Sequence, residues 1–217
     1  IFTLPQFFED LFKRADRQMG DYVQLERVTP QWRNFFEDGL VFDLHEDPEL
    51  MRKELDKLEG DADQHWKEFQ KFLTYGRDQY EIINEGYFDK GLDTFWEFIR
   101  YYGLRKIGSR IDYKNSMADS IAEHFSNDHL RSIFEYFIKY VGSSALVSPG
   151  YMNLMPIIQF DFGLWYVKGG MYSLAEGLGK LMGEMGIPIH LEADVAEINK
   201  KGRMVTGLTL KDGAQFE

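Results

Sequence analysis

The stretch from residue 164 to residue 198 constrains the fold more than any other segment, because its hydrophobic period changes twice. A short aromatic run at 164–167 leads through Gly169 and Gly170 into a segment whose apolar residues recur every three or four positions, as in an amphipathic helix. Gly186 and Pro188 end that helix, since glycine suits the position after a helix and proline cannot continue one. From Ile187 the apolar residues alternate, so we expect a half-buried strand over 187–198.

The remaining chain predicts helices flanked by short strands. Residues 22–44 alternate around the turn Glu37-Asp38-Gly39 and indicate a meander of about three strands, and a hairpin with the turn Asp212-Gly213 ends the chain. Helical periods run from 48 to 58, over a long stretch after Asp61, and over 116–141 with a break at 126–128, whose residues are typical of a helix cap. We therefore expect an α+β protein, with a mainly helical lobe and a small mixed or antiparallel sheet.

Three regions follow from this reading of the periods. Residues 1–45 form an N-terminal helix and small meander, 46–163 a helical lobe, and 164–217 a strand–helix–strand segment with a hairpin. The aromatic share of 16% favours large apolar pockets or interfaces, although taken alone it is explained better by a bulky core.

Composition excludes several classes of function. A net charge of -11 argues against a general nucleic-acid-binding protein, which needs a basic surface. The absence of cysteine rules out disulfides, thiolate metal sites and cysteinyl-flavin links, and it is compatible with a reducing compartment. No apolar run is long enough to span a bilayer. We expect a cytoplasmic protein that associates with the membrane peripherally.

Several possible functional motifs do not have the structural context that their function requires. The glycines at 177, 179 and 183 lie inside the predicted helix, so they favour close helix packing over a phosphate-binding loop. The histidines lack the spacing of a metal site, and we expect none. Asp161, between two phenylalanines, is the most interesting acid, but an exposed loop position explains it more simply.

Residues 92–114 combine aromatic and basic side chains in an acidic chain. This combination is typical of a helix that lies on anionic lipid, and the docking residues would be Trp96, Phe98, Arg100, Arg105, Lys106 and Arg110. The alternative is a helix buried on both sides, whose arginines pair with acids elsewhere. Both interpretations stay open from the sequence.

Three short segments carry a resemblance to a known family. They are Tyr166-Val167-Lys168-Gly169-Gly170-Met171, Tyr22-Val23-Gln24-Leu25 with Val28-Thr29-Pro30, and Asp128-His129-Leu130-Arg131. Their order and spacing resemble the bacterial phytoene desaturases and related carotenoid desaturases of the FAD-dependent amine-oxidase-type superfamily. Because the chain begins without methionine and stops inside a predicted strand, we expect an internal fragment that lacks the FAD-binding Rossmann domain.

The resemblance implies FAD-dependent desaturation of a long apolar polyene such as phytoene by the full-length protein. It also implies that 46–163 is a substrate-binding and membrane-docking lobe and that 164–217 leads back toward the FAD domain. Gly169, Gly170 and Val195 would then contact FAD, although FAD is not expected to stay bound to this fragment alone. The residues expected to line the substrate site are Phe160, Phe162, Trp165, Tyr166, Lys168 and Met171. No catalytic acid or base is assigned, and without the resemblance the glycine pair is a plain strand-to-helix turn.

Two alternatives remain at this point. One is another flavoenzyme of the superfamily: an amine, protoporphyrinogen or retinoid oxidoreductase, or a carotenoid isomerase. The other is a non-enzymatic module that binds lipid or a membrane surface. The expected partners are an apolar polyene and a membrane surface, with no nucleic acid, and the oligomeric state is left open.

Overall fold

A computed structural model describes residues 2–104 and 110–216. The chain divides into two compact units, Ile1–Met171 and Tyr172–Glu217. Helices dominate, the described strands pair in small antiparallel sheets, and the described residues form no Rossmann domain. The predicted α+β class is therefore confirmed. The three-region division stays a prediction.

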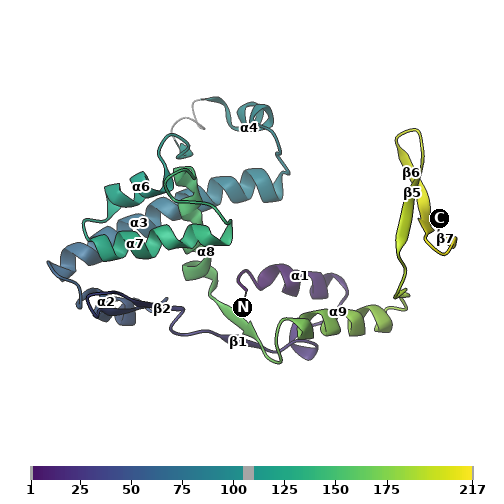
Figure 1. The fold of residues 1–217 in the computed structure, drawn as a ribbon, viewed down its shortest axis with the longest axis horizontal. Coiled ribbons are helices and arrows are strands. Elements are labelled where there is room, and N and C mark those ends of the chain that lie inside the picture. The colour runs from purple at the N-terminus through teal and green to yellow at the C-terminus, as the bar shows by residue number, and fades with distance from the viewer. Residues whose placement is uncertain (1, 105–109, 217) are drawn as a thin grey trace. The chain divides into compact units, whose positions relative to one another are not determined.

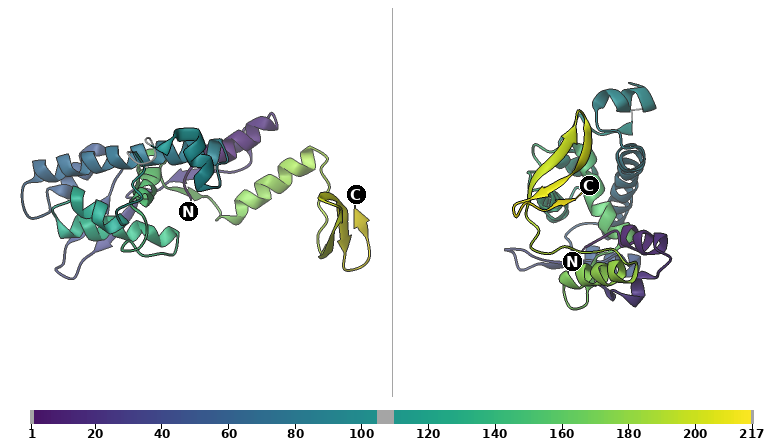
Figure 2. Two further views of the ribbon diagram at one scale, coloured as in Figure 1. Left: turned by 90° about the horizontal axis from the view of Figure 1, so that it is seen from above. Right: turned by 90° about the vertical axis from the view of Figure 1, so that its right-hand side faces the viewer.

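The long helix α3 (Ala62–Ile83) organises the first unit. Helices α6 (Met117–His124) and α8 (Leu154–Phe162) pack against it, and α7 (Asp128–Glu135) packs against α6 (Figure 1 and Figure 2). Their shared core is unusually aromatic, with Phe72 and Phe134 fully buried between α3 and α7. The other described helical elements are α1 (Gln6–Arg14), η1 (Met19–Asp21), α2 (Pro48–Leu55), η2 (Asn84–Asp89), α4 (Phe95–Tyr102), η3 (Tyr136–Tyr140) and η4 (Gly150–Asn153).

Two antiparallel strand pairs complete the first unit. Strands β2 (Trp32–Phe35) and β3 (Val41–Leu44) form the predicted hairpin. Strand β1 (Leu25–Arg27), however, pairs with β4 (Trp165–Val167) and not with β2, so the predicted three-stranded meander is wrong. The chain passes from one sheet to the other between Val28 and Gln31. The amide of Val28 donates to the carbonyl of Leu164, whereas the amide of Gln31 donates to the carbonyl of Leu44.

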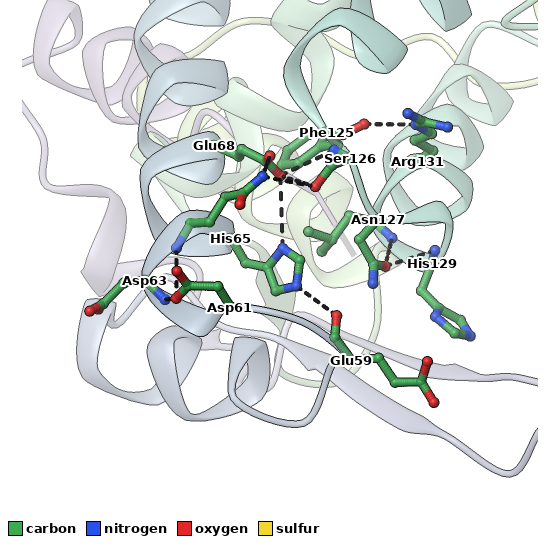
Figure 3. A network of polar contacts seen from close by, with 12 residues as sticks. Glu59, Asp61, Asp63, His65, Glu68, Phe125, Ser126, Asn127, His129 and Arg131 are labelled. Carbon is green, nitrogen blue, oxygen red and sulfur yellow. Dashed lines mark hydrogen bonds and ion pairs between the residues drawn. The ribbon is translucent and has the colours of Figure 1, made fainter.

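The break between α6 and α7 is fastened to α3 by polar contacts (Figure 3). The Asn127 side chain accepts from the amides of His129 and Leu130 and so caps α7, as the sequence predicts. The Glu68 carboxylate on α3 accepts from both the amide and the hydroxyl of Ser126, each at 3.1 Å. These bonds fix where the chain turns, and thus which face α7 presents to α3.

The second unit contains α9 (Tyr172–Glu184) and an antiparallel sheet of β5 (Val195–Lys201), β6 (Met204–Leu210) and β7 (Gln215–Phe216). The predicted terminal hairpin is confirmed, and the glycines at 177, 179 and 183 lie within α9, not in a phosphate-binding loop. The strand predicted over 187–198 is wrong before Val195, since pairing with β6 begins there, and Leu191 is 82% exposed.

Close packing of α8 against α3 requires the glycine at position 76. A Cβ there would lie 2.3 Å from Cγ1 of Ile157 and 3.0 Å from the carbonyl oxygen of Asn153. We expect Gly76→Ala to destabilise the first unit by about 1–3 kcal/mol through overpacking, measured by denaturant unfolding. Gly179→Ala on α9 is the control: its added Cβ meets nothing within 4 Å, so it should be neutral or stabilising by up to about 1 kcal/mol.

Candidate functional site

A cleft of about 360 Å³ lies among α2, α3, α8 and the residues that follow β3 in the first unit. Its apolar lining comes from Met51, Trp66, Phe69, Leu73 and Phe160, and its polar lining includes His45, Glu46, Gln70, Thr74, Arg77 and Asp161. The ring of Phe160 meets that of Phe69 edge-on, with centroids 5.5 Å apart. The lining is thus about half apolar and half polar, so the cleft offers a small apolar group a contact surface beside side chains that can form hydrogen bonds. Of the six residues predicted to line the substrate site, Phe160 reaches this cleft.

Asp161 belongs to helix α8, not to the exposed loop that the sequence suggested. Its two carboxylate oxygens accept from Nε and Nη2 of Arg77 at 2.7 and 2.6 Å. This bidentate pair raises the pKa of Arg77, mainly through its hydrogen bonds with Asp161. Both residues line the cleft, so the pair contributes a fixed dipole there and not a free general base.

The remaining predicted substrate residues point in different directions. Alternation along β4 puts Tyr166 on the opposite face from Trp165, which lines a separate cleft of about 550 Å³ beside η1 and β1. Phe162 packs on Tyr80, with ring centroids 5.4 Å apart. Lys168 lies 3.7 Å from Glu26, and Met171 is 46% exposed. The described structure thus does not gather these six residues around one cavity, and their role in binding substrate stays a prediction.

The turn predicted to contact FAD has the expected backbone. Gly169 and Gly170 adopt φ angles of 84° and 96°, which favour glycine, and a Cβ on Gly170 would meet nothing within 4 Å. Val195 is 50% exposed and belongs to the second unit. Room for a planar group beside one glycine is not an FAD site, because the described strands pair only antiparallel and so supply no parallel strand–helix–strand unit for the pyrophosphate. FAD stays a prediction, and we derive no step through it.

Helix α4 ends at Tyr102, so the helix predicted over 92–114 is shorter than expected. Phe98 packs inward toward Ile82, whereas Trp96 is 76% exposed and Arg100 is also exposed, so α4 is not buried on both sides. Arg110 is exposed, and Arg105 and Lys106 lie outside the described residues. None of the described helices combines the length and apolar character that a membrane crossing requires.

Asp43, His45 and Glu54 each bring a potential metal-ligand atom to within 4.8 Å of the others, a cluster that histidine spacing did not reveal. Both carboxylates already have cationic partners: Arg33 donates two bonds to Asp43, and Lys57 lies 2.6 Å from Glu54. A metal ion would compete with these two charges. We therefore interpret the cluster as an ion-pair network between β2, β3 and α2.

The structure also reveals a lysine in an aromatic box that the sequence analysis missed. Nζ of Lys139 lies 3.3 Å from the ring centroid of Trp32, 3.7 Å from that of Tyr136 and 5.4 Å from that of Tyr140. The side chain of Gln159 holds two walls in place, because its oxygen accepts from Trp32 Nε1 at 2.7 Å and from the Tyr140 hydroxyl at 3.3 Å. The two tyrosines lie at i–3 and i+1 of Lys139, so the sequence could have indicated their proximity to the lysine. It gives no sign that Trp32 lies beside them.

Comparison with known proteins finds similar chains along almost the full sequence. No family model matches. The chain is 46% identical over 213 residues to a 4,4'-diapolycopene oxygenase of Methylomonas, and 40% and 39% identical to 4,4'-diaponeurosporene oxygenases of Staphylococcus haemolyticus and Staphylococcus aureus. These alignments cover 98–99% of this chain. The chain spans 42% of the length of each relative.

These relatives correct the resemblance drawn from the sequence. The order and spacing of the three segments suggested a phytoene desaturase, whereas the similar proteins carry the names of oxygenases. The assignment to the phytoene and carotenoid desaturases, as an internal fragment of such an enzyme, is therefore wrong. Short segments shared by order and spacing did not separate proteins that differ in the reaction they are named for.

The Asp43–Arg33 pair predicts a pH-dependent contribution to stability. Hydrogen bonds from Arg33 hold the pKa of Asp43 below its ordinary 3.8, against the opposing effect of burial. The stabilisation is therefore complete above pH 3.8 and is lost as the pH falls through the lower folded value. We expect Asp43→Asn to lower the Tm by a few degrees near pH 7, and the difference to shrink on acidification below pH 3.8. Asp10→Asn, at an exposed pair with Lys13, should leave the Tm nearly unchanged at both pH values.

Proposed function

We propose that this chain takes part in the oxygenation of an acyclic polyene of the carotenoid class. The observation that carries the proposal is the 46% identity, over 98% of this chain, to a protein named 4,4'-diapolycopene oxygenase. The substrate would be an unsaturated hydrocarbon, for which an apolar, aromatic binding surface is the physical requirement. The proposed reaction class is oxidoreduction within carotenoid biosynthesis.

The cleft beside Phe160 supports this proposal. Its rings and aliphatic side chains offer dispersion contacts to a flat conjugated chain, and burial of the apolar surface on both partners favours binding. A long polyene exceeds a cleft of about 360 Å³, so we propose that one end of the substrate enters it. The Arg77–Asp161 pair would then lie near the end of the polyene where oxygen is introduced.

Expression of the natural full-length protein in a bacterial host that accumulates an acyclic polyene tests the proposal. Leu73 lines the cleft, so Leu73→Trp should fill it and lower the yield of oxygenated polyene several-fold, measured by liquid chromatography and mass spectrometry. Leu11→Trp, at a 47% exposed position on α1 away from this cleft, is the matched control. Absence of oxygenated product from the unaltered protein would reject the function, and equal yields from both variants would reject the cleft.

We also propose that α4 docks on an anionic membrane surface, where an apolar polyene would reside. Exposed Tyr87 and Phe88 precede α4, exposed Leu104 follows it, and Trp96 is 76% exposed. Arg100, on the same helix, adds the positive charge that anionic headgroups attract. Tryptophan suits this role because its ring is apolar and its N–H remains compatible with the headgroup region.

Vesicle co-sedimentation measures this docking. Trp96→Ala should weaken partitioning onto phosphatidylglycerol vesicles about tenfold, since burying an exposed aromatic side chain contributes about 1.5–3 kcal/mol. Arg100→Glu should weaken it on anionic vesicles and leave binding to neutral phosphatidylcholine vesicles unchanged. Val147→Ala, at a 77% exposed position outside α4, is the control. Equal partitioning of Trp96→Ala and Val147→Ala would reject docking through α4.

A further inference from the structure

Lys139 differs from an ordinary surface lysine in what surrounds its amine. Three aromatic rings lie around Nζ, two of them within 4 Å, and no described carboxylate forms an ion pair with it. Lysines are usually solvated or paired with an acid, because a buried ammonium without a counter-ion is unfavourable. The rings compensate in part, since their faces attract a cation.

The box also keeps the amine accessible from one side. Tyr136 and Tyr140 are 60% and 50% exposed, so two walls face solvent, whereas Gln159 behind them is 2% exposed. Burial lowers the pKa of Lys139 from 10.5 to about 8, so a sizeable share of the amine is neutral near pH 8. A neutral amine is the nucleophilic form of lysine. The site therefore combines a reactive amine with rings that hold a positive charge.

We propose that Lys139 is a carbonyl-binding lysine that condenses with an apolar conjugated aldehyde and holds the product as a cationic imine against Trp32, Tyr136 and Tyr140. Nζ forms a bond to the carbonyl carbon, and the carbonyl oxygen leaves as water with the two hydrogens of the amine. No electrons are gained or lost. The imine nitrogen then takes a proton from solvent, and its charge occupies the place where the ammonium ion was.

The aromatic walls select for the kind of aldehyde. A conjugated chain attached to the imine delocalises the positive charge and offers a flat apolar surface to the rings, whereas a polar or anionic aldehyde gains neither contact. The choice of a polyene aldehyde rests on the proposed function, because oxygenation of a hydrocarbon carbon leads to an alcohol and then to a carbonyl group. The reactivity of the amine does not depend on that function.

Reductive trapping tests the inference directly. The purified chain is incubated at about pH 8 with retinal, as a conjugated polyene aldehyde, and reduced with sodium cyanoborohydride before peptide mapping by mass spectrometry. An amine with a pKa of about 8 has on the order of a hundredfold more neutral form at this pH than an ordinary lysine. We expect Lys139 to carry at least about tenfold more label than any exposed lysine.

Two conservative variants make the result specific. Lys139→Arg should abolish this preferential labelling, whereas Lys71→Arg, at an exposed position on α3, should leave it intact. Circular dichroism checks that both variants keep the fold. Label spread evenly over the lysines, or undiminished total label in Lys139→Arg, would overturn the proposal.

The role of the rings has its own readout. A protonated polyene imine absorbs at longer wavelength than the neutral one, so absorbance against pH reports the pKa of the adduct. Tyr136→Leu removes one exposed ring and should lower that pKa, while the adduct itself still forms. An unchanged pKa would overturn the part of the proposal that assigns charge stabilisation to the box.

A saturated aldehyde, decanal, separates the reactivity of the Lys139 amine from its proposed preference for a polyene aldehyde. Labelling of Lys139 by decanal but not by retinal would overturn the polyene assignment and leave only a reactive amine. The proposed function is measured independently, as oxygenated polyene formed in the host. Its failure together with retinal labelling at Lys139 would therefore be distinguishable from failure of the inference.

Discussion

The stacking of aromatic rings around Phe134 is the interaction on which the first unit depends. Its ring centroid lies 4.7 Å from that of Phe72 on α3, 4.9 Å from that of Phe125 and 6.3 Å from that of Phe160 on α8. One side chain thus joins the long helix to the α6–α7 break and to the helix that lines the cleft. The ring of Phe125 stacks nearly parallel to that of Phe134, and the rings of Phe72 and Phe160 are tilted against it. Such pairs add to the free energy gained by burying the rings, and their geometry constrains how the helices approach.

A buried polar contact links this aromatic core to the sheets. Gln31 and Gln159 are 4% and 2% exposed and bond to each other twice, since Gln31 donates to the Gln159 carbonyl and Gln159 Nε2 donates to Gln31 Oε1. The remaining oxygen of Gln159 accepts from Trp32 and Tyr140. The same residue that positions α8 beside the cleft therefore also positions the box around Lys139. Buried polar groups whose hydrogen bonds are all formed in this way specify one arrangement of the core.

The sequence predicted best those features that neighbouring residues determine. The cap at Asn127 and the turn at Asp212-Gly213 needed only a few adjacent side chains, and each formed as expected. Contacts between residues distant in sequence could not be predicted. The pairing of β1 with β4 and the contact of Trp32 with Lys139 depend on tertiary packing, which no local sequence pattern encodes. The strand expected from Ile187 failed for the same reason, because alternation indicates a strand only where a second strand supplies hydrogen bonds. The substrate-site residues inferred from the resemblance also required tertiary contacts that the sequence does not give. Of those six, only Phe160 lines the cleft.

The pairing of Leu25 with Val167 has a consequence for how the protein is made. A chain leaving the ribosome exposes β1 well before β4, because the strand that satisfies its backbone emerges only after β2, β3 and the described helices from α2 to α8. Until then, the edge of β1 offers unpaired amides and carbonyls to any extended segment nearby. The first unit can therefore close only near the end of its own synthesis, and a nascent chain arrested before Trp165 would carry an open edge capable of pairing with a neighbouring chain.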